Sequence, residues 1–138
     1  MTGIDLSHFY NYFTTSPIQL TAIPSINEEG RVDVDFKDSS ILHMEILMPR
    51  MHRGEIPYPM GRVNGTFYCI GRGLTQMQNF PTHVARNLRI QDNRFSSLEG
   101  FPREVGGFVR MTVHKHLPLL RMLQSYIGEE IYLKNDYS

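Results

Sequence analysis

One motif is repeated three times between Gly65 and Leu123, at a fixed step of 21 residues. Its opening segments are Gly65–Cys69, Arg86–Ile90 and Gly107–Met111. Prolines at 81 and 102 follow the last apolar position of the first two copies. A constant period of this size is typical of a solenoid, in which each repeat buries its apolar face against the next and no repeat is stable alone. The period therefore constrains the architecture more strongly than any other feature of the chain.

Each copy places apolar residues at the same offsets from its first strand residue. In the copy that begins at Phe67, these residues are Cys69, Leu74, Met77 and Phe80. The alternating apolar pair predicts a strand whose apolar side chains face the core and whose neighbours face solvent. Valines at 63, 84 and 105 lie four residues before each strand.

The segment Arg31–Phe36 also alternates and predicts a further strand. Counted from Val34, apolar residues recur at the same offsets, so we interpret it as an earlier, degenerate copy. It precedes Phe67 by 33 residues, which is 12 more than the period. The extra length falls in an insertion loop, residues 48–60, where three prolines and a glycine forbid a regular element. Insertions in solenoids are often binding loops; a neutral insertion is the alternative.

Both ends of the repeats carry segments that predict caps. Asp5–Phe13 is expected to form a short aromatic helix within an N-terminal cap at 1–30. Leu117–Tyr126 is expected to form a helix within a C-terminal cap at 117–138. Ile131 follows Val109, the first apolar strand residue of the third copy, by 22 positions, which predicts a fifth strand.

These elements together predict a single domain. Its repeats occupy 31–116, and its fold class is an α/β solenoid of four or five coils with a parallel sheet.

The spacing of the apolar residues resembles a leucine-rich repeat. Leu98–Phe108 resembles the "SLEGxPxxVGGxF" repeat of leucine-rich-repeat-like proteins encoded by tailed bacteriophages. Ser16–Val32 and Leu117–Leu123 resemble the two caps of that group. The resemblance implies a short leucine-rich-repeat-like stack, a phage origin and a location in the cytoplasm of an infected bacterium. It implies no reaction.

One position departs from the leucine-rich-repeat pattern. The asparagine that follows the strand in such repeats is present as Asn93, while its counterparts are Ser39, Arg72 and His114. We therefore expect no continuous asparagine ladder, and the other turns must satisfy their backbone groups by different means.

Charge and cysteine content indicate which partners and which cellular compartment to expect. Net charge is zero, yet residues 1–48 sum to −5, residues 49–125 to +7 and residues 126–138 to −2. The middle block holds ten arginines and one lysine, and arginine is favoured at protein interfaces as well as at phosphates. One cysteine allows no internal disulfide. We find no signal peptide and no apolar run long enough for a membrane span, so we expect an intracellular protein without a membrane partner.

The residues between the inward apolar pairs form outward columns on the predicted sheet. The central column is Asp35, Tyr68, Arg89, Arg110 and Tyr132. Tyrosine and arginine are enriched at binding hot spots.

Two apolar side chains, Phe108 and Ile70, are predicted to face outward beside the column. The insertion loop adds Arg50, Arg53 and Tyr58. Together with the column they are our candidate partner-binding residues; an ordinary polar sheet face is the alternative.

Other constellations are weaker. Cys69 occupies a core position and is interpreted as an inert buried thiol. His114 and His116 lack further metal ligands at a recognised spacing. Asp33 and Asp35 share one strand face and are interpreted as partners for arginine rather than as an acid–base pair. We therefore expect no cofactor, no metal and no catalysis.

The leading hypothesis is a non-enzymatic protein-binding module, made by a phage to bind a host protein through the sheet face and the loop. One alternative is nucleic-acid binding by the arginine-rich block. Another is a structural protein that self-assembles through an edge strand or the loop.

Overall fold

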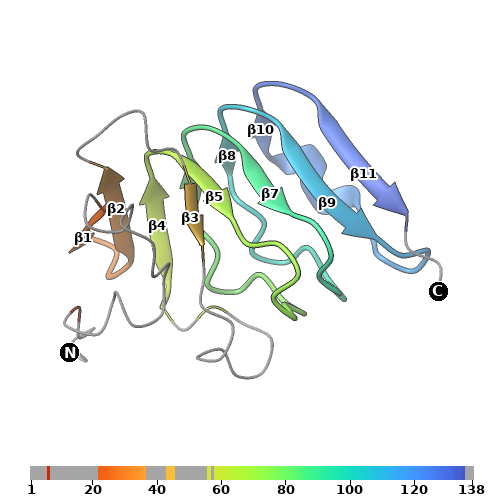
Figure 1. Ribbon diagram of the computed structural model, residues 1–138, viewed down its shortest axis with the longest axis horizontal. Coiled ribbons are helices and arrows are strands. Elements are labelled where there is room, and N and C mark those ends of the chain that lie inside the picture. Colours follow the sequence, from red (N-terminus) through yellow and green to blue (C-terminus); the bar gives the residue numbers. More distant parts are fainter. Residues whose placement is uncertain (1–5, 7–21, 37–42, 46–55, 57, 136–138) are drawn as a thin grey trace.

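The computed structural model describes residues 6, 22–36, 43–45, 56 and 58–135. This part of the chain forms a solenoid-like stack of mostly parallel strands that makes about three turns (Figure 1). Two sheets run along the stack, and each coil contributes one strand to each sheet. An extended segment without regular structure, such as residues 74–79, returns the chain from the five-stranded sheet to the six-stranded sheet.

The six-stranded sheet contains the shorter strands. In spatial order these are β1 (Ala22–Ile26), β2 (Val32–Phe36), β4 (Met60–Val63), β6 (His83–Val84), β8 (Glu104–Val105) and β10 (Tyr126–Ile127). β1 pairs antiparallel with β2, and all later neighbours are parallel. The valines at 63, 84 and 105 are buried here and form one side of the core.

The five-stranded sheet lies across the core from the first and carries the predicted ladder. In chain order its strands are β3 (His43–Glu45), β5 (Thr66–Tyr68), β7 (Leu88–Ile90), β9 (Val109–Val113) and β11 (Ile131–Asn135). Phe67 pairs with Leu88, and Leu88 pairs with Val109. Ile131 pairs with Val109 in turn. The 21-residue period and the fifth strand at Ile131 are therefore confirmed.

The core follows the apolar offsets. The phenylalanine, leucine and methionine residues of the extended segments are 0–1% exposed, namely Leu74, Met77, Phe80, Phe95, Leu98 and Phe101. Phe80 lies between Phe67 and Phe95, with ring centroids 5.5 and 5.7 Å away. Stacking of coils thus buries one continuous apolar spine, as the repeat pattern predicts.

Close contact between coils depends on glycine at the turn that joins the two sheets. A Cβ atom on Gly106 would collide with the backbone oxygen of Ala85, and one on Gly128 would collide with that of Gly106. The backbones approach this closely because Gly106 donates to the Val84 carbonyl at 2.9 Å. Any side chain at Gly106 would force the coils apart.

Asn93 forms the backbone hydrogen bonds expected of the asparagine that follows the strand in a leucine-rich-repeat pattern. Its Oδ1 accepts from the backbone N–H groups of Arg72 and Leu74, each at 3.0 Å. Its Nδ2 donates to the carbonyls of Cys69 and Ile90 at 2.8 and 3.0 Å. One coil further on, the His114 ring nitrogen Nε2 lies 2.9 Å from the Phe95 carbonyl. A different side chain therefore bonds the backbone where asparagine is missing.

The prediction that Val34 opens the ladder is wrong. Val34 pairs with Val63 in the six-stranded sheet, and the strand that precedes β5 is β3, with Met44 opposite Phe67. An apolar alternation fits either sheet equally well, so its neighbour and not its pattern decides its place. The stack makes about three turns, where the sequence predicted four or five coils.

The helix predicted over Leu117–Tyr126 is also wrong. The segment contains a five-residue 3₁₀ helix, η4 (Leu120–Gln124), in which only Met122 is buried. Pro118 and the short apolar run leave too few residues for an α-helix stabilised by packing. Almost no helix is present in the described residues.

Two further predictions lie mostly outside the described residues. These are the N-terminal helix at 5–13 and the insertion loop at 48–60. Of the loop, Ile56 is buried, Tyr58 packs against the core and Met60 begins β4.

Candidate sheet-face binding site

The outward side chains of the five-stranded sheet form a column in the predicted order. The register places Tyr68 beside Arg89, Arg89 beside Arg110 and Arg110 beside Tyr132. All four side chains are at least partly exposed. Successive parallel strands lie about 4.8 Å apart, so the column is a nearly straight row on one face.

The two arginines of this column stack on aromatic rings. The guanidinium carbon of Arg89 lies 5.1 Å from the centre of the Tyr68 ring. The guanidinium carbon of Arg110 lies 5.0 Å from the Phe108 ring centre and 4.9 Å from that of Tyr132. The Phe108 and Tyr132 rings meet edge to face at 5.8 Å. These contacts restrict both guanidinium groups, since cation–π attraction favours a cation over the ring face.

Neither guanidinium is neutralised by a described acidic side chain. In this part of the chain the ion pair is Lys134 with Asp92, at 3.4 Å and well exposed. The Nε atom of Arg89 is buried and has no hydrogen-bond partner. Arg89 and Arg110 lie directly opposite each other on neighbouring strands, an arrangement in which like charges repel.

The edges of the column bring further groups to the same face. The hydroxyl of Tyr132 donates to Glu130 at 3.0 Å, and this bond is the main cause that raises the pKa of Tyr132. Ile70 and Phe108 are partly buried rather than fully outward. The buried Oε1 of Gln91 has no hydrogen-bond partner. The face therefore combines aromatic, cationic and amide groups.

Asp35 does not belong to this column, which corrects the predicted site. It lies on β2 in the six-stranded sheet, next to Asn64, which donates to it. In the register of the five-stranded sheet, the backbone position beside Tyr68 on the preceding strand belongs to Glu45 of β3. The signal for this was the 23-residue distance from Met44 to Phe67, closer to the period than the 33 residues from Val34. Asp33 likewise accepts from the Arg62 backbone at 2.7 Å.

The loop residues of the predicted site do not join the column. Tyr58 packs against the core. Arg50 and Arg53 lie outside the described residues.

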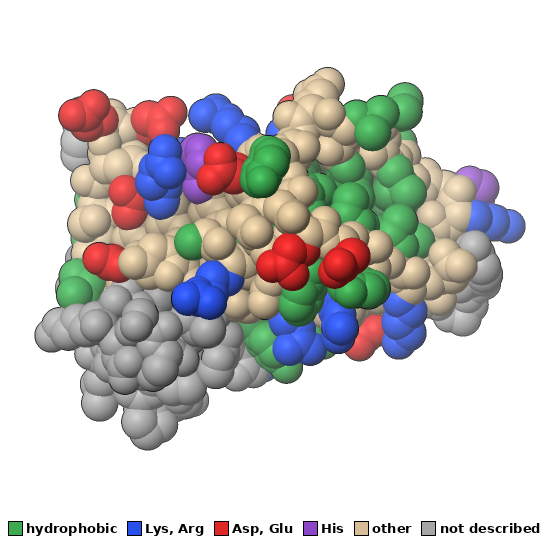
Figure 2. Space-filling view, turned by 90° about the horizontal axis from the view of Figure 1, so that it is seen from above, with side chains coloured by type: hydrophobic (Ala, Val, Ile, Leu, Met, Phe, Trp, Pro, Cys, Tyr) green, Lys and Arg blue, Asp and Glu red, His purple; other side chains and the backbone are tan. Residues whose placement is uncertain are grey.

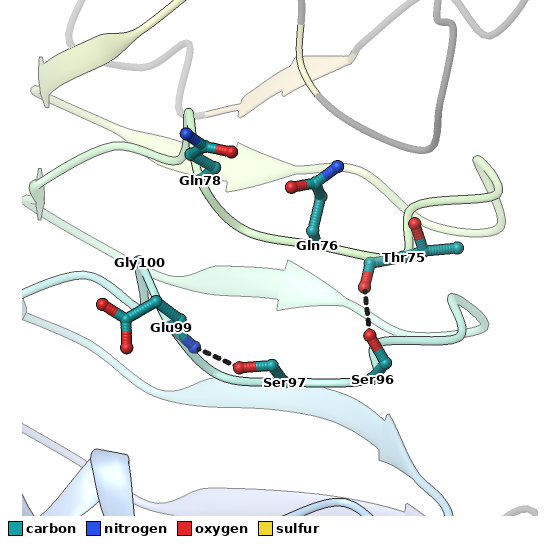
Figure 3. A pocket seen from close by; sticks show the side chains of 7 residues that line it. All are labelled: Thr75, Gln76, Gln78, Ser96, Ser97, Glu99 and Gly100. Carbon is teal, nitrogen blue, oxygen red and sulfur yellow. Dashed lines mark hydrogen bonds between the residues drawn. The ribbon is translucent and has the colours of Figure 1, made fainter.

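A hollow lies between two extended segments, away from the column (Figure 3). Its volume is about 680 Å³, and it is lined by Thr75, Gln76, Gln78, Ser96, Ser97, Glu99 and Gly100. Ser96 donates from its hydroxyl to the Thr75 carbonyl at 3.4 Å, and Ser97 accepts from the Glu99 backbone at 3.0 Å. The hollow is a polar groove with one carboxylate, and the Ser96 hydroxyl in it joins two coils while the Ser97 hydroxyl bonds its own segment.

Some arginines bond the backbone instead of facing solvent. Arg31 donates to the Met60 and Phe80 carbonyls, and burial lowers its pKa. Arg121 donates to the Phe101 carbonyl at 2.9 Å and to Ser125 at 3.0 Å. These side chains lie at the ends of the extended segments, where they satisfy carbonyl groups that the sheets do not reach.

The weaker sequence candidates are placed as follows. Cys69 is a buried free thiol. The His114 and His116 rings lie 6.5 Å apart. The described residues contain no cluster of three or more potential metal ligands.

The chain was compared with family models, with curated proteins and with solved structures. No family model, no curated protein and no solved structure matches the chain. Among the described residues, no helix has the length and apolar character needed to cross a bilayer.

Proposed function

We propose that this chain is a non-enzymatic protein-binding module whose partner presents carboxylates to the Tyr68–Arg89–Arg110–Tyr132 column. The observation that carries the proposal is the pair of opposed guanidinium groups without an acidic partner among the described residues. At the roughly 4.8 Å spacing of neighbouring strands, two like unit charges repel by on the order of 1 kcal/mol in water, and by more when solvent is excluded. A carboxylate placed between them reverses the sign of that interaction.

The aromatic rings favour such a contact because they restrict the arginines before binding. Ordering a long side chain at an interface costs about 0.5–1.5 kcal/mol, and a guanidinium already stacked at 4.9–5.1 Å has lost much of that freedom. Arginine binds carboxylates through two parallel hydrogen bonds. The four residues lie on four successive strands, so the row spans about 14 Å, which suits an extended acidic segment or a flat acidic patch.

We further propose that the stack is a degenerate leucine-rich-repeat-like protein of phage origin and that its partner is a host protein in the bacterial cytoplasm. The apolar spacing and the bonding of Asn93 support the repeat type. The phage origin and the host partner rest on the resemblance of Leu98–Phe108 to phage-encoded repeats.

Affinity capture from bacterial lysate, followed by calorimetry with the purified partner, tests the proposal. Arg89→Glu combined with Arg110→Glu is expected to weaken binding at least 100-fold, since central arginines of interfaces typically contribute 1–3 kcal/mol or more each. The matched control is Arg86→Glu combined with Arg94→Glu, which makes the same charge change at exposed positions outside the column. Equal binding by both double variants would exclude this face as the binding site.

The stacked rings and arginines also match the type of surface that binds single-stranded nucleic acid. The same variants separate the two functions when they are titrated with a labelled oligonucleotide. Binding at about 50 mM salt that falls steeply as salt rises would favour nucleic acid over an acidic protein.

A further inference from the structure

The C-terminal end of the stack exposes side chains of the type that every inner coil buries. Leu120 and Leu123 of η4 are 77% and 81% exposed, and Tyr126 of β10 is 64% exposed. Ile131 and Leu133 of β11 are 42% and 39% exposed, although their ladder partners Val109 and Met111 are 0% exposed. In Figure 2, hydrophobic side chains gather in the half of the molecule that holds the C-terminal strands.

The last strand, β11, is an edge strand, and one side of its backbone is unpaired among the described residues. The backbone N–H of Val109 donates to the Glu130 carbonyl at 3.0 Å. Because hydrogen bonds alternate sides along a parallel strand, the backbone groups of Glu130, Tyr132 and Lys134 face β9. Those of Ile131 and Leu133 face away from the sheet, so this edge is open to another strand.

We propose that this end binds a second copy of the same chain, with β11 pairing antiparallel to β11 around a two-fold axis at Tyr132. Backbone geometry limits the possible registers, because the outward-facing groups of Ile131 and Leu133 must meet outward-facing groups of the second copy. The register centred on Tyr132 places Ile131 opposite Leu133 of the second copy, and both pairs exchange hydrogen bonds.

Charge then selects this register among those that the backbone allows. With Tyr132 on the axis, Glu130 lies opposite Lys134 of the second copy, and Lys134 lies opposite its Glu130. These positions are non-hydrogen-bonded pairs, in which side chains are closest, and opposite charges there are stabilising. Shifting the register by two residues in either direction separates Glu130 from Lys134. The strand is thus complementary to itself in charge and in apolar character.

The available surface is appropriate for a dimer. A standard interface buries about 800 Å² per partner, and six large apolar side chains that are 39–81% exposed supply several hundred Å² of it. They are Leu120, Leu123, Tyr126, Ile131, Tyr132 and Leu133. The competing contact is weak, since the Lys134–Asp92 pair is exposed and exposed ion pairs contribute little to stability. An isologous dimer would join the two five-stranded sheets and continue the arginine–aromatic column across the axis.

Mass measurement by light scattering or sedimentation, across a wide range of protein concentration, tests this proposal. The wild-type chain is expected to reach twice the monomer mass of 16.0 kDa and to stop there. Glu130→Lys and Lys134→Glu are each expected to dimerise at least tenfold more weakly, because each places two like-charged pairs across the axis. An equimolar mixture of these two variants is expected to form a heterodimer, because all four facing charges are then opposite.

A monomer at every concentration would overturn the proposal, as would a dimer insensitive to both charge reversals. Growth beyond the dimer would also overturn it, because a head-to-tail contact with the other end of the stack builds an open fibre. Leu120→Asp combined with Leu123→Asp provides a second test at exposed positions and is expected to give monomer with an unchanged circular dichroism spectrum. All variants retain Arg89 and Arg110, so the outcome is independent of the proposed carboxylate binding.

Discussion

Removal of the Asn93 side chain offers a sharp test of how the coils are joined. Asn93 is 4% exposed and connects two successive coils through its amide. Its Oδ1 is an acceptor for two backbone N–H groups, those of Arg72 and Leu74. Its Nδ2 donates to carbonyls of the preceding coil and of its own coil. Asn93→Ala therefore removes partners from several backbone groups at once, without deleting apolar surface.

The magnitude follows from those groups. A buried donor or acceptor that loses its partner costs about 1–3 kcal/mol, and the Leu74 bond is buried while the Arg72 bond is partly solvated. We expect Asn93→Ala to lower the free energy of unfolding by about 2–4 kcal/mol. This is a large part of the 5–15 kcal/mol typical of a domain. With a urea m-value of about 2 kcal/mol/M, the midpoint moves down by about 1–2 M.

Urea unfolding monitored by circular dichroism measures this change, since the chain has no tryptophan. The matched control is Asn64→Ala, which removes the same side chain and its solvent-exposed hydrogen bond to Asp35, and it is expected to change stability by less than about 0.5 kcal/mol. An Asn93→Ala midpoint within about 0.3 M of the wild type would refute the argument that this amide joins the coils.

Two further predictions concern the six-stranded sheet. Gly106→Ala is expected to lower the thermal midpoint by several degrees, because its Cβ would collide with the Ala85 carbonyl; an unchanged midpoint in calorimetry would contradict the close backbone contact. His83 is expected to titrate below 6.5 by NMR, because burial lowers its pKa first and Arg62 lowers it further. Its protonation therefore disfavours the fold. The contribution of neutral His83 to the free energy of unfolding is complete above pH 6.5. It is lost as pH falls from there toward the folded-state pKa. Arg62→Gln is expected to raise this pKa and Glu104→Gln to lower it, and the opposite order would contradict the assignment.

The five-stranded sheet was predictable because its apolar pattern repeats over three copies of 21 residues. Phe67, Leu88 and Val109 recur at one spacing with the same apolar offsets, and three copies leave little ambiguity. The six-stranded sheet was not predicted as a sheet, although its valines at 63, 84 and 105 follow the repeat period. Strands of two residues such as β6 and β8 contain a single inward side chain, and a single side chain has no period.

The candidate site was predictable in its order and not in its contacts. The period alone places Tyr68, Arg89, Arg110 and Tyr132 in one row, and the register confirms that row. The stacking of Arg110 between Phe108 and Tyr132 depends on side-chain torsions that no spacing specifies. Asp35 was misplaced because strand alternation does not identify the neighbouring strand.

Hydrogen bonding distinguishes arginines that the charge count treats as equal. Residues 49–125 sum to +7, which suggests a basic surface. Arg121 of this block donates hydrogen bonds to a backbone carbonyl inside the stack, as Arg31 does earlier in the chain. Arg89 and Arg110 stack on rings and keep donors for another molecule. The positive charge exposed in this column is therefore confined to Arg89 and Arg110. A short acidic segment of a protein fits it better than a long phosphate backbone, which needs a continuous row of cations.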